Sequence, residues 1–561
     1  MKTIPGRLNN METTNLSKIR REKMLHTIKE IKKNIVDEET LNNLSLIENE
    51  LTKKKYGLIW EEHEERVDKE LETQIPTFEE VKGKQIKTCN DKFNFLLEGD
   101  NLHSLYLLEK THRGRIDVIY IDPPYNTGNK DFTYNDKYID DVDEFKHSKW
   151  LSFMSKRLNI AYKLLNDTGV IFISIDNNEL SQLKMLCDDI FGESNFVCNI
   201  CRQAIKGGSR ANNIKTVNDY VLIYAKNIAK MKSFTGYDKE EQKLNLEDEK
   251  GLYRRGRELN KWGAGSRRED SPSMWFPIPG PNGEDVYPIR NDGSDGRWRW
   301  GKTKLLKAVK ENDVIFEKRA NGTYIVYEKE RGNKNTKSQF TSWFSDNYIN
   351  AKGSESLKKI FNTMMSVFDY AKPVELIHDL VFMANCPNGI VLDFFAGSGT
   401  TAQAVLELNK EDGGNRQFIL CTNNENNICE NITYKRIDSV INGYTNVDGI
   451  NANLKYYKTS YVPRINTDEE NLSKNLMVNI KNLIQLENGI EIDDKIVRVI
   501  LTEEEIDKFT TNDKELDECE KLYISSDILL TSKQSKIFND YNIELFIIPE
   551  YYFEEEIREV A

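Results

Sequence analysis

The chain has 561 residues, of which 38% are hydrophobic and 30% are charged, and its formal net charge is −12. This length predicts three or four domains, and the sequence has no apolar run near the roughly 20 residues that a membrane span needs. The eight cysteines are scattered, and the basic N-terminal residues lack the apolar stretch of a secretory signal. We therefore expect a protein of the reducing cytoplasm without a membrane partner.

The charge is unevenly distributed along the chain. Residues 201–350 carry 29 Lys and Arg against 20 Asp and Glu, whereas residues 461–560 carry 11 against 24. The acidic C-terminal part therefore accounts for the negative total. A basic central region is where a surface that binds nucleic-acid phosphates is expected.

The N-terminal region, residues 1–85, is predicted as a helical extension. Residues 14–72 place apolar side chains at roughly helical spacing, with charged residues on the other face. Such an extension either docks a partner or packs on its own domain, and the sequence leaves both alternatives open. Residues 75–85, which include Pro76, are predicted as a linker.

Strands and helices alternate through residues 86–200. Apolar strands are predicted at 94–98, 115–122 and 170–176, and helices at 101–111, 150–165 and 177–191. Strands that are almost continuously apolar, with helices between them, indicate a parallel sheet covered on both faces.

The regularity is interrupted at residues 201–350, which are rich in Gly, Asn, Arg and Trp and are predicted as an inserted domain. Residues 351–460 return to an α/β pattern, with helices at 372–384 and 400–409 and strands at 389–395 and 417–425. Residues 461–561 are acidic and mixed, and are predicted as an α+β domain.

The first chemical motif, Asp122-Pro123-Pro124-Tyr125, follows directly on a predicted buried strand. Two prolines form a rigid turn, which would hold the Asp122 carboxylate and the Pro124 carbonyl as neighbouring acceptors. Two acceptors suit an exocyclic amine with two hydrogens, and Tyr125 offers a face on which an extruded base can stack. The alternative is an ordinary Pro-Pro turn with Tyr125 covering the edge of the core.

The second motif runs from Asp393 to Thr401 and links a predicted strand to a helix. Gly397 and Gly399 allow the backbone to approach a ligand, and Thr400 or Thr401 can cap the helix. No lysine follows Gly399, so the loop lacks the pattern of a phosphate-binding loop. The helix start suits the carboxylate of a zwitterionic ligand such as S-adenosylmethionine.

Two further residues are candidates for contacts with that ligand. Glu425 ends the next strand and can accept hydrogen bonds from ribose hydroxyls, although a simple polar strand end is the alternative. Lys372 lies just before a Pro-started helix and could meet the ligand carboxylate, or could be solvated.

Other features are less specific. Cys198 and Cys201 form a single CxxC without two further ligands at related spacing, so no metal site is predicted. Trp298 and Trp300 alternate with arginines, a pattern that either contacts phosphates and bases or anchors a β-hairpin.

Together these motifs resemble the β-class of DNA amino-methyltransferases, in which DPPY precedes an inserted target-recognition domain and the glycine loop follows it. The segments DPPYNTG, HSKWLSFMSKRL, VIFISIDNNE, FDYAKPVELI, LDFFAGSGTT and FILCTNNEN are similar to modification (Mod) subunits of type III restriction–modification systems. The resemblance covers most of residues 55–462. It implies a Rossmann-like, S-adenosylmethionine-dependent methyltransferase sheet that methylates the N6 amine of adenine.

The resemblance also implies residue roles. Catalysis would fall to Asp122, Pro123, Pro124 and Tyr125, with Asn126 as a weaker candidate. The cofactor would be surrounded by Asp100, Lys372, Asp393, Phe395, Ala396, Gly397, Gly399, Thr400 and Glu425. The expected partners are double-stranded DNA with the target base flipped, a second copy of the chain, and a helicase–nuclease restriction subunit.

Several alternatives stay open. The chain could be a solitary adenine methylase, or could act on the N4 amine of cytosine, although Asp at the first motif position favours adenine. Methylation of protein glutamine or of RNA is disfavoured by the basic insert. A DNA-binding protein without catalysis is disfavoured by the intact motifs.

Overall fold

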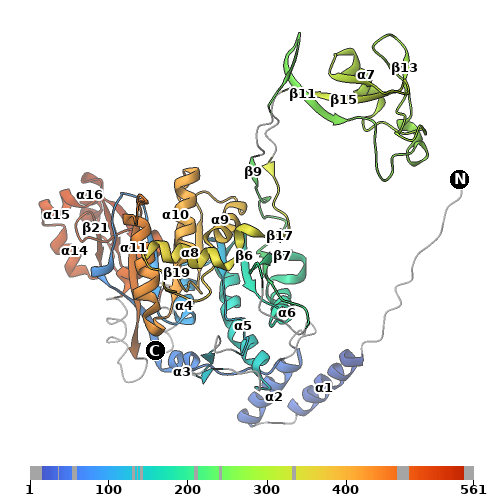
Figure 1. Ribbon diagram of the computed structural model, residues 1–561. Coiled ribbons are helices and arrows are strands. Elements are labelled where there is room, and N and C mark those ends of the chain that lie inside the picture. The colour runs from blue at the N-terminus through green and yellow to red at the C-terminus, as the bar shows by residue number, and fades with distance from the viewer. Residues whose placement is uncertain are drawn as a thin grey trace. The chain divides into compact units, whose positions relative to one another are not determined.

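The computed structural model describes residues 16–33, 35, 37–52, 60–128, 133–134, 137–138, 143–207, 213–238, 243–331, 337–463, 479–548 and 552. The chain divides into two compact units (Figure 1). The first combines Met1–Ser233 with Thr341–Ala561, and the second is Phe234–Phe340.

The first unit is built on a ten-stranded sheet in the order β1-β20-β2-β19-β18-β3-β6-β8-β7-β17. Its strands are β1 (Gln74–Glu80), β2 (Phe93–Glu98), β3 (Ile116–Ile121), β6 (Leu165–Ile175), β7 (Phe196–Gln203), β8 (Asn218–Ala225), β17 (Trp343–Phe344), β18 (Ile390–Asp393), β19 (Gln417–Thr422) and β20 (Asn453–Pro463). The strands from β20 to β6 are parallel to their neighbours, whereas β1 and β8 run antiparallel to theirs. All six residues of β2 are buried, which explains why four of them are apolar.

Helices pack in two sets (Figure 1). One set contains α4 (Asn101–His112), α5 (Lys146–Leu164), α6 (Leu180–Cys187) and α13 (Ile480–Asn488); the other contains α8 (Asn350–Ile360), α9 (Val374–Met383), α10 (Thr400–Asp412) and α11 (Tyr434–Asn442). From β3 the chain crosses through α5 to β6, and from β18 it crosses through α10 to β19 in the opposite direction along the sheet. Because such crossovers are right-handed, the two sets lie on opposite faces, and the sheet has a switch point between β3 and β18.

Strand register brings the two sequence motifs together. Val391 and Leu392 of β18 pair with Val118 and Ile119 of β3. Asp122 and Asp393 therefore mark the carboxyl ends of neighbouring strands, although they are far apart in sequence. This agrees with the predicted parallel sheet and with ligand binding at its switch point.

The N-terminal region differs from its prediction in one element. It forms α1 (Leu16–Lys32), α2 (Glu38–Thr52) and α3 (Arg66–Thr73), as the helical pattern predicts. The predicted linker at 75–85 is wrong, because residues 74–80 form β1 and pair with β20. Pro76 is tolerated there because β1 is the edge strand and pairs on one side only.

The bounds of the predicted insert also differ from the separate unit. Residues 201–350 were expected to lie outside the main sheet, yet β8 and the end of β7 are part of it, and β17 is its last strand. Ala225 and the four residues before it are fully buried beside β6. Their apolar character favours burial in the larger sheet over a place in the smaller unit.

The second unit has its own core. A four-stranded sheet is formed by β10 (Leu246–Asp248), β11 (Gly251–Glu258), β15 (Tyr324–Glu330) and β14 (Val314–Lys318), and two-stranded pairs by β12 (Ile278–Pro279) with β13 (Asp285–Val286) and by β9 (Tyr237–Asp238) with β16 (Lys337–Ser338). Trp298 is fully buried with α7 (Lys302–Lys310), and its indole donates to the Phe276 carbonyl at 2.8 Å. Trp298 is therefore a core residue, and Trp300 packs partly buried against the same core.

The C-terminal region was predicted as α+β, but its strands and helices alternate along the chain, as in an α/β domain. Strands β21 (Val497–Ile500), β22 (Lys521–Ile524) and β23 (Glu544–Ile547) are all parallel. Helices α14 (Glu503–Phe509), α15 (Asp513–Glu518) and α16 (Ser532–Asp540) connect them. Across the described residues, the helices are all too short or too polar to span a membrane.

Candidate functional site

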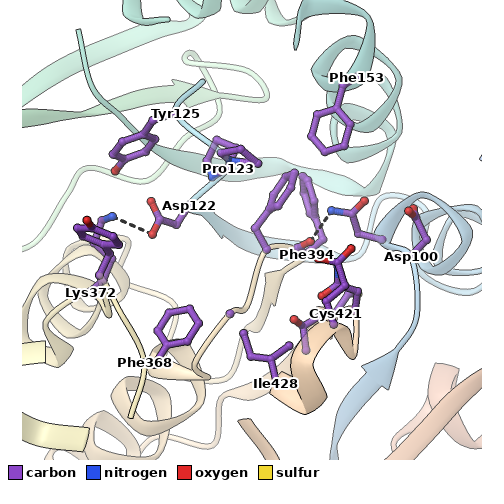
Figure 2. A pocket seen from close by; sticks show the side chains of 18 of the residues that line it. Asp100, Asp122, Pro123, Tyr125, Phe153, Phe368, Lys372, Phe394, Cys421 and Ile428 are labelled. Carbon is purple, nitrogen blue, oxygen red and sulfur yellow. Dashed lines mark hydrogen bonds and ion pairs between the residues drawn. The ribbon is translucent and has the colours of Figure 1, made fainter. Parts of the chain in front are cut away.

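A cavity of about 730 Å³ opens at the carboxyl ends of β2, β19, β18, β3 and β6 (Figure 2). Both sequence motifs line it. The lining residues are Glu65, Arg66, Val67, Asp100, Asn101, Asp122, Pro123, Pro124, Tyr125, Thr127, Phe153, Asp176, Asp219, Asn350, Phe368, Asp369, Tyr370, Lys372, Phe394, Phe395, Gly397, Cys421, Thr422, Asn423, Glu425 and Ile428.

Asp122 and Lys372 both line this cavity and form an ion pair, on the left in Figure 2. The Lys372 ammonium lies 2.8 Å from Asp122 Oδ2, and 4.9 Å from the centre of the Tyr125 ring. Asp122 Oδ1 is buried and has no hydrogen-bond partner among the described residues. One carboxylate oxygen is thus occupied by a cation, and the other is left for a ligand.

The two prolines differ in their hydrogen bonds. The Pro124 carbonyl accepts a hydrogen bond from Trp150 Nε1 at 2.7 Å. The described residues supply no such donor to the Pro123 carbonyl. A carbonyl oxygen has two lone pairs, so this hydrogen bond does not exclude Pro124 as the second acceptor, which stays a prediction, and the Pro123 carbonyl is another candidate for that role. Trp150 lies in α5 and is fully buried, and its hydrogen bond to Pro124 fixes the Pro-Pro turn.

Asn126 anchors the end of the turn and does not line the cavity. Its backbone has φ of 57°, and its side-chain Nδ2 donates to Glu179 Oε1 at 2.5 Å. The same Glu179 oxygen lies 2.7 Å from His147 Nδ1. Burial raises the pKa of Glu179, although hydrogen bonds from Asn126 and His147 oppose it. This network holds the position of the residue that follows Tyr125.

The hydroxyl of Tyr125 is buried. The hydroxyl has no hydrogen-bond partner among the described residues. Burial raises the pKa of Tyr125 far above its usual value, and the Asp122 charge raises it further. The residue therefore stays a neutral aromatic, as a stacking surface requires.

Asp393 supports the glycine loop from beneath and does not line the cavity. Its Oδ1 accepts from the Phe395 amide at 3.0 Å, and its Oδ2 accepts from the Thr401 hydroxyl. Burial raises the pKa of Asp393 to about 7. Asp393 therefore holds the strand–loop–helix junction, and it is not among the residues that line the cavity.

The glycine loop owes its shape to two positive φ angles, 47° at Gly397 and 77° at Gly399. The Gly397 carbonyl accepts from Thr433 Oγ1 at 2.6 Å, and a Cβ at Gly399 would come 3.0 Å from Thr433 Cγ2. Glycine is needed at both positions for the backbone angle, and at Gly399 also for space. Gly397 lines the cavity, whereas Ala396, Gly399 and Thr400 lie behind it.

Arg436, which the sequence analysis missed, supports the same loop. It is fully buried, and its Nη1 lies 2.8 Å from Thr400 Oγ1 and 3.1 Å from Ser398 Oγ. Burial lowers the pKa of Arg436 to about 10. Thr400 is thus occupied by a structural hydrogen bond, which accounts for its absence from the cavity wall.

The right-hand half of the cavity in Figure 2 is formed by Asp100, Phe153, Phe394, Cys421 and Ile428. Asp100 caps α4 by accepting from the Leu102 amide at 2.8 Å, and its side chain is 36% exposed. The wall thus combines apolar surface with a carboxylate.

The side chains of Asn101 and Arg157 brace this half. Asn101 donates from Nδ2 to the Phe394 carbonyl at 2.9 Å, and its Oδ1 accepts from Arg157 Nε at 2.6 Å. Arg157 is fully buried and also contacts Glu65 at 3.0 Å. These contacts tie the start of α4 and α5 to the start of the glycine loop.

Glu425 lies just past β19, in the short helical turn Glu425–Asn427. It is exposed, and the described residues give its carboxylate no hydrogen-bond partner. The carboxylate is therefore accessible to a ligand in the cavity, and its contact with ribose hydroxyls stays a prediction.

The cavity wall is strongly acidic. It contains seven carboxylate residues but two cationic ones, Arg66 and Lys372. Lys372 is committed to Asp122, which differs from its predicted contact with a ligand carboxylate. Asp122, Asp219 and Glu65 form ion pairs with Lys372, Arg202 and Arg157. The excess of negative charge therefore lies on the other carboxylates of the wall, and it favours a ligand that carries positive charge.

The described cysteines and acidic residues form no group suited to a metal ion. Cys198 and Cys201 are free and lie in β7. The CxxC is therefore part of a sheet strand.

Comparisons with known proteins agree on one family. A family model described as DNA methylase matches residues 116–461. The EcoPI Mod subunit of a type III restriction-modification enzyme, from Escherichia phage P1, is 34% identical over an alignment of 433 residues, and the match covers 70% of this chain and 67% of that protein. The type II methyltransferase M.KpnI from Klebsiella pneumoniae is 36% identical over an alignment of 352 residues, and the match covers 60% of this chain and 82% of that protein.

A solved structure of the cytosine-N4-specific PvuII DNA methyltransferase matches 72% of this chain and 96% of its own. The sequence identity is 11% and the TM-score is 0.33, so this match carries no argument about the site.

Proposed function

The chain belongs to the DNA methylase family, and on that premise we propose that it transfers a methyl group from S-adenosylmethionine to the N6 amine of adenine in a specific DNA sequence. The observation that carries the proposal is the position of Asp122. It presents one unpaired, buried oxygen inside a cavity that also contains the glycine loop.

The amine-binding half of the cavity contains Asp122, Pro123, Tyr125 and Lys372. The lone pair of an adenine amine is delocalised into the ring, so the amine is a poor nucleophile until its nitrogen becomes pyramidal. Asp122 Oδ1 and the Pro123 carbonyl would each accept one amine hydrogen and favour that geometry. Tyr125 would stack on the ring of the extruded base.

Lys372 acts on this step through Asp122. By binding Oδ2 it leaves Oδ1 as the single carboxylate oxygen that faces the amine, and it fixes the rotation of the carboxylate. After methyl transfer, Asp122 Oδ1 would also accept the proton that the methylated amine loses. Lys372 is thus a positioning residue.

The other half of the cavity suits S-adenosylmethionine, which carries a sulfonium and an ammonium group. The excess of carboxylates over cations in the wall matches that charge. Glu425 would accept from the ribose hydroxyls, and Asp100 lies where it could bind the ammonium. Phe395 and Ile428 offer apolar surface for the adenine ring. When bound, the cofactor supplies a methyl group activated by the sulfonium.

We infer that double-stranded DNA is the macromolecular substrate, and that residues Phe234–Phe340 recognise its sequence. The likeness to a Mod subunit of a type III restriction-modification enzyme supports a restriction subunit as a partner. We further propose that this partner is a helicase–nuclease, and that the chain acts as a homodimer in the cytoplasm. A solitary methylase is the alternative. Identification of the proteins that co-purify with the chain separates the two.

N4-methylation of cytosine is the other outcome of the same chemistry. Single-molecule sequencing of DNA from cells that express the chain tests the choice, because it reports the modified base and its sequence context together. N6-methyladenine at one recurring sequence supports the proposal. N4-methylcytosine at that sequence, or unmodified DNA, overturns it.

A further inference from the structure

Asn350 is a cavity-lining residue to which the sequence motifs assign no role. It is the first residue of α8, and its backbone amide donates to the Ala204 carbonyl at 2.8 Å. The side chain is partly buried. Its position is thus fixed by the junction between the end of β7 and the start of α8.

The orientation of the Asn350 amide follows from its partner. Asn350 Oδ1 lies 2.9 Å from Arg202 Nη1. A guanidinium only donates hydrogen bonds, so the atom that faces it must be the amide oxygen. The amide nitrogen, Nδ2, therefore points away from Arg202.

Arg202 itself is held rigidly. It is fully buried, and its Nε donates to Asp219 Oδ1 at 2.6 Å while Nη1 donates to the Tyr348 carbonyl at 2.6 Å. A second hydrogen bond links Arg202 Nη2 to Asp219 Oδ2. This bidentate pair leaves the guanidinium one orientation, and thereby fixes Asn350.

Asn350 lies in the half of the cavity that contains Tyr125. Arg202, which contacts Asn350, lies in β7, and Asp219 lies in β8; both strands follow β6 on the β3 side of the sheet, away from β18, β19 and β2. Asp219 and Asn350 both line the cavity as well. The described residues give Asn350 Nδ2 no hydrogen-bond partner, so a donor is available in this half.

We propose that Asn350 binds the target base by donating a hydrogen bond from Nδ2 to the ring nitrogen beside the exocyclic amine, which in adenine is N1. This rests on the proposed function. The edge of adenine presents an amine that donates and a neighbouring N1 that accepts. Asp122 would accept a hydrogen bond from the amine, and Asn350 Nδ2 would donate one to N1. Arg202 and Asp219 are positioning residues that act through Asn350.

The test uses the full-length protein and two duplexes that carry its methylation sequence. One has adenine at the target position and the other has 1-deazaadenine, in which N1 is replaced by a C–H group. For the wild type we expect kcat/KM to fall about ten- to a hundredfold on the analogue, because the donor is left without an acceptor. In Asn350→Ala, the two duplexes should differ by less than about threefold.

Asn350→Asp is the second variant, since it keeps an oxygen for Arg202 and replaces the free donor with an acceptor. It should lose activity on adenine more than on 1-deazaadenine. Tyr125→Phe is the matched control for the other donor in this half, and it should keep the wild-type discrimination. S-adenosylmethionine binding, measured by calorimetry, checks that each variant is folded.

An equal penalty for 1-deazaadenine in the wild type and in both Asn350 variants would overturn the inference. Loss of the penalty in Tyr125→Phe would assign the contact to the Tyr125 hydroxyl and overturn it too. Failure of the wild type to methylate the adenine duplex would refute the proposed function instead, so the two failures are distinguishable.

Discussion

The ammonium of Lys372 lies 2.8 Å from Asp122 Oδ2, while Asp122 Oδ1 is buried without a hydrogen-bond partner among the described residues. In the proposed mechanism, Oδ2 holds the ion pair with Lys372, and Oδ1 accepts a hydrogen bond from the amine of the target base. Lys372 was predicted from the sequence to contact the cofactor, and its ion pair with Asp122 places it in the amine-binding half of the cavity.

Asp122→Ala should abolish methylation while S-adenosylmethionine still binds. The variant lacks the acceptor for the amine, and we expect kcat to fall by at least about a hundredfold, as when one stabilising group of an active site is removed. Transfer of tritiated methyl groups to DNA measures the activity, and calorimetry measures the cofactor. Methylation at the wild-type rate would exclude Asp122 from the mechanism.

Lys372→Met should lower kcat with little change in cofactor affinity. The substitution preserves length but leaves the Asp122 carboxylate free to rotate, so we expect a loss of about ten- to a hundredfold in kcat. Lys372→Arg keeps the cation and should recover part of it. A large rise in the Kd for S-adenosylmethionine with unchanged kcat would instead support the cofactor contact predicted from sequence.

A double variant tests directly whether the two carboxylate oxygens of Asp122 have separate roles. Asp122→Asn has one side-chain oxygen, for which Lys372 and the amine compete, so this variant should be almost inactive. Adding Lys372→Met removes the competitor and should raise kcat at least about tenfold above Asp122→Asn. If the double variant is slower than Asp122→Asn alone, the two oxygens do not have separate roles.

Glu425→Gln should weaken cofactor binding. A carboxylate that accepts from two hydroxyls contributes charge-assisted hydrogen bonds, and we expect the Kd for S-adenosylmethionine to rise about tenfold. Glu430→Gln is the matched control, because Glu430 pairs with Lys84 and does not line the cavity. Equal affinities of the two variants would argue against a role for Glu425.

Asp393 predicts a pH dependence of stability. Burial raises the pKa of Asp393 to about 7 in the folded protein. Between the pKa of about 4 expected in the unfolded chain and about 7, the folded state alone holds the proton, so stability falls as the pH rises through this window. Above about pH 7 the effect is complete, at a few kcal/mol by order of magnitude.

Asp393→Asn removes this titration and keeps a similar shape, since the Thr401 hydroxyl can turn to accept from the amide. The melting temperature of the wild type should therefore fall relative to the variant from pH 5 to pH 7, and the difference should be constant above pH 8. A difference that does not change with pH would show that Asp393 does not titrate in this range.

Exchange of residues 234–340 for the corresponding unit of a relative should change the recognised DNA sequence and preserve methyl transfer. The unit has its own core, and strands β7, β8 and β17 of the main sheet stay in place. Sequencing of methylated DNA reports the outcome. An unchanged target sequence would locate recognition outside this unit.

Strand-end motifs were predictable because their chemistry is local. The apolar runs before Asp122 and Asp393 predict buried parallel strands, and the carboxyl ends of such strands meet at one edge of the sheet. Both motifs therefore line one cavity, as does Glu425.

Long-range partners were not predictable. Nothing in the sequence links Lys372 to Asp122, Arg436 to Thr400, or Arg202 to Asn350, since these pairs depend on how distant segments pack. Strand β1 was missed because Pro76 is typical of a linker, and only its place at the sheet edge makes it acceptable in a strand.

The central claim is that this cavity methylates the N6 amine of adenine. Mass spectrometry of nucleosides tests it most directly, after the purified protein has been incubated with S-adenosylmethionine and unmethylated genomic DNA. We predict N6-methyl-2′-deoxyadenosine with the wild type and none with Asp122→Ala. N4-methyl-2′-deoxycytidine, or the same yield of methyladenine from both proteins, would contradict the account.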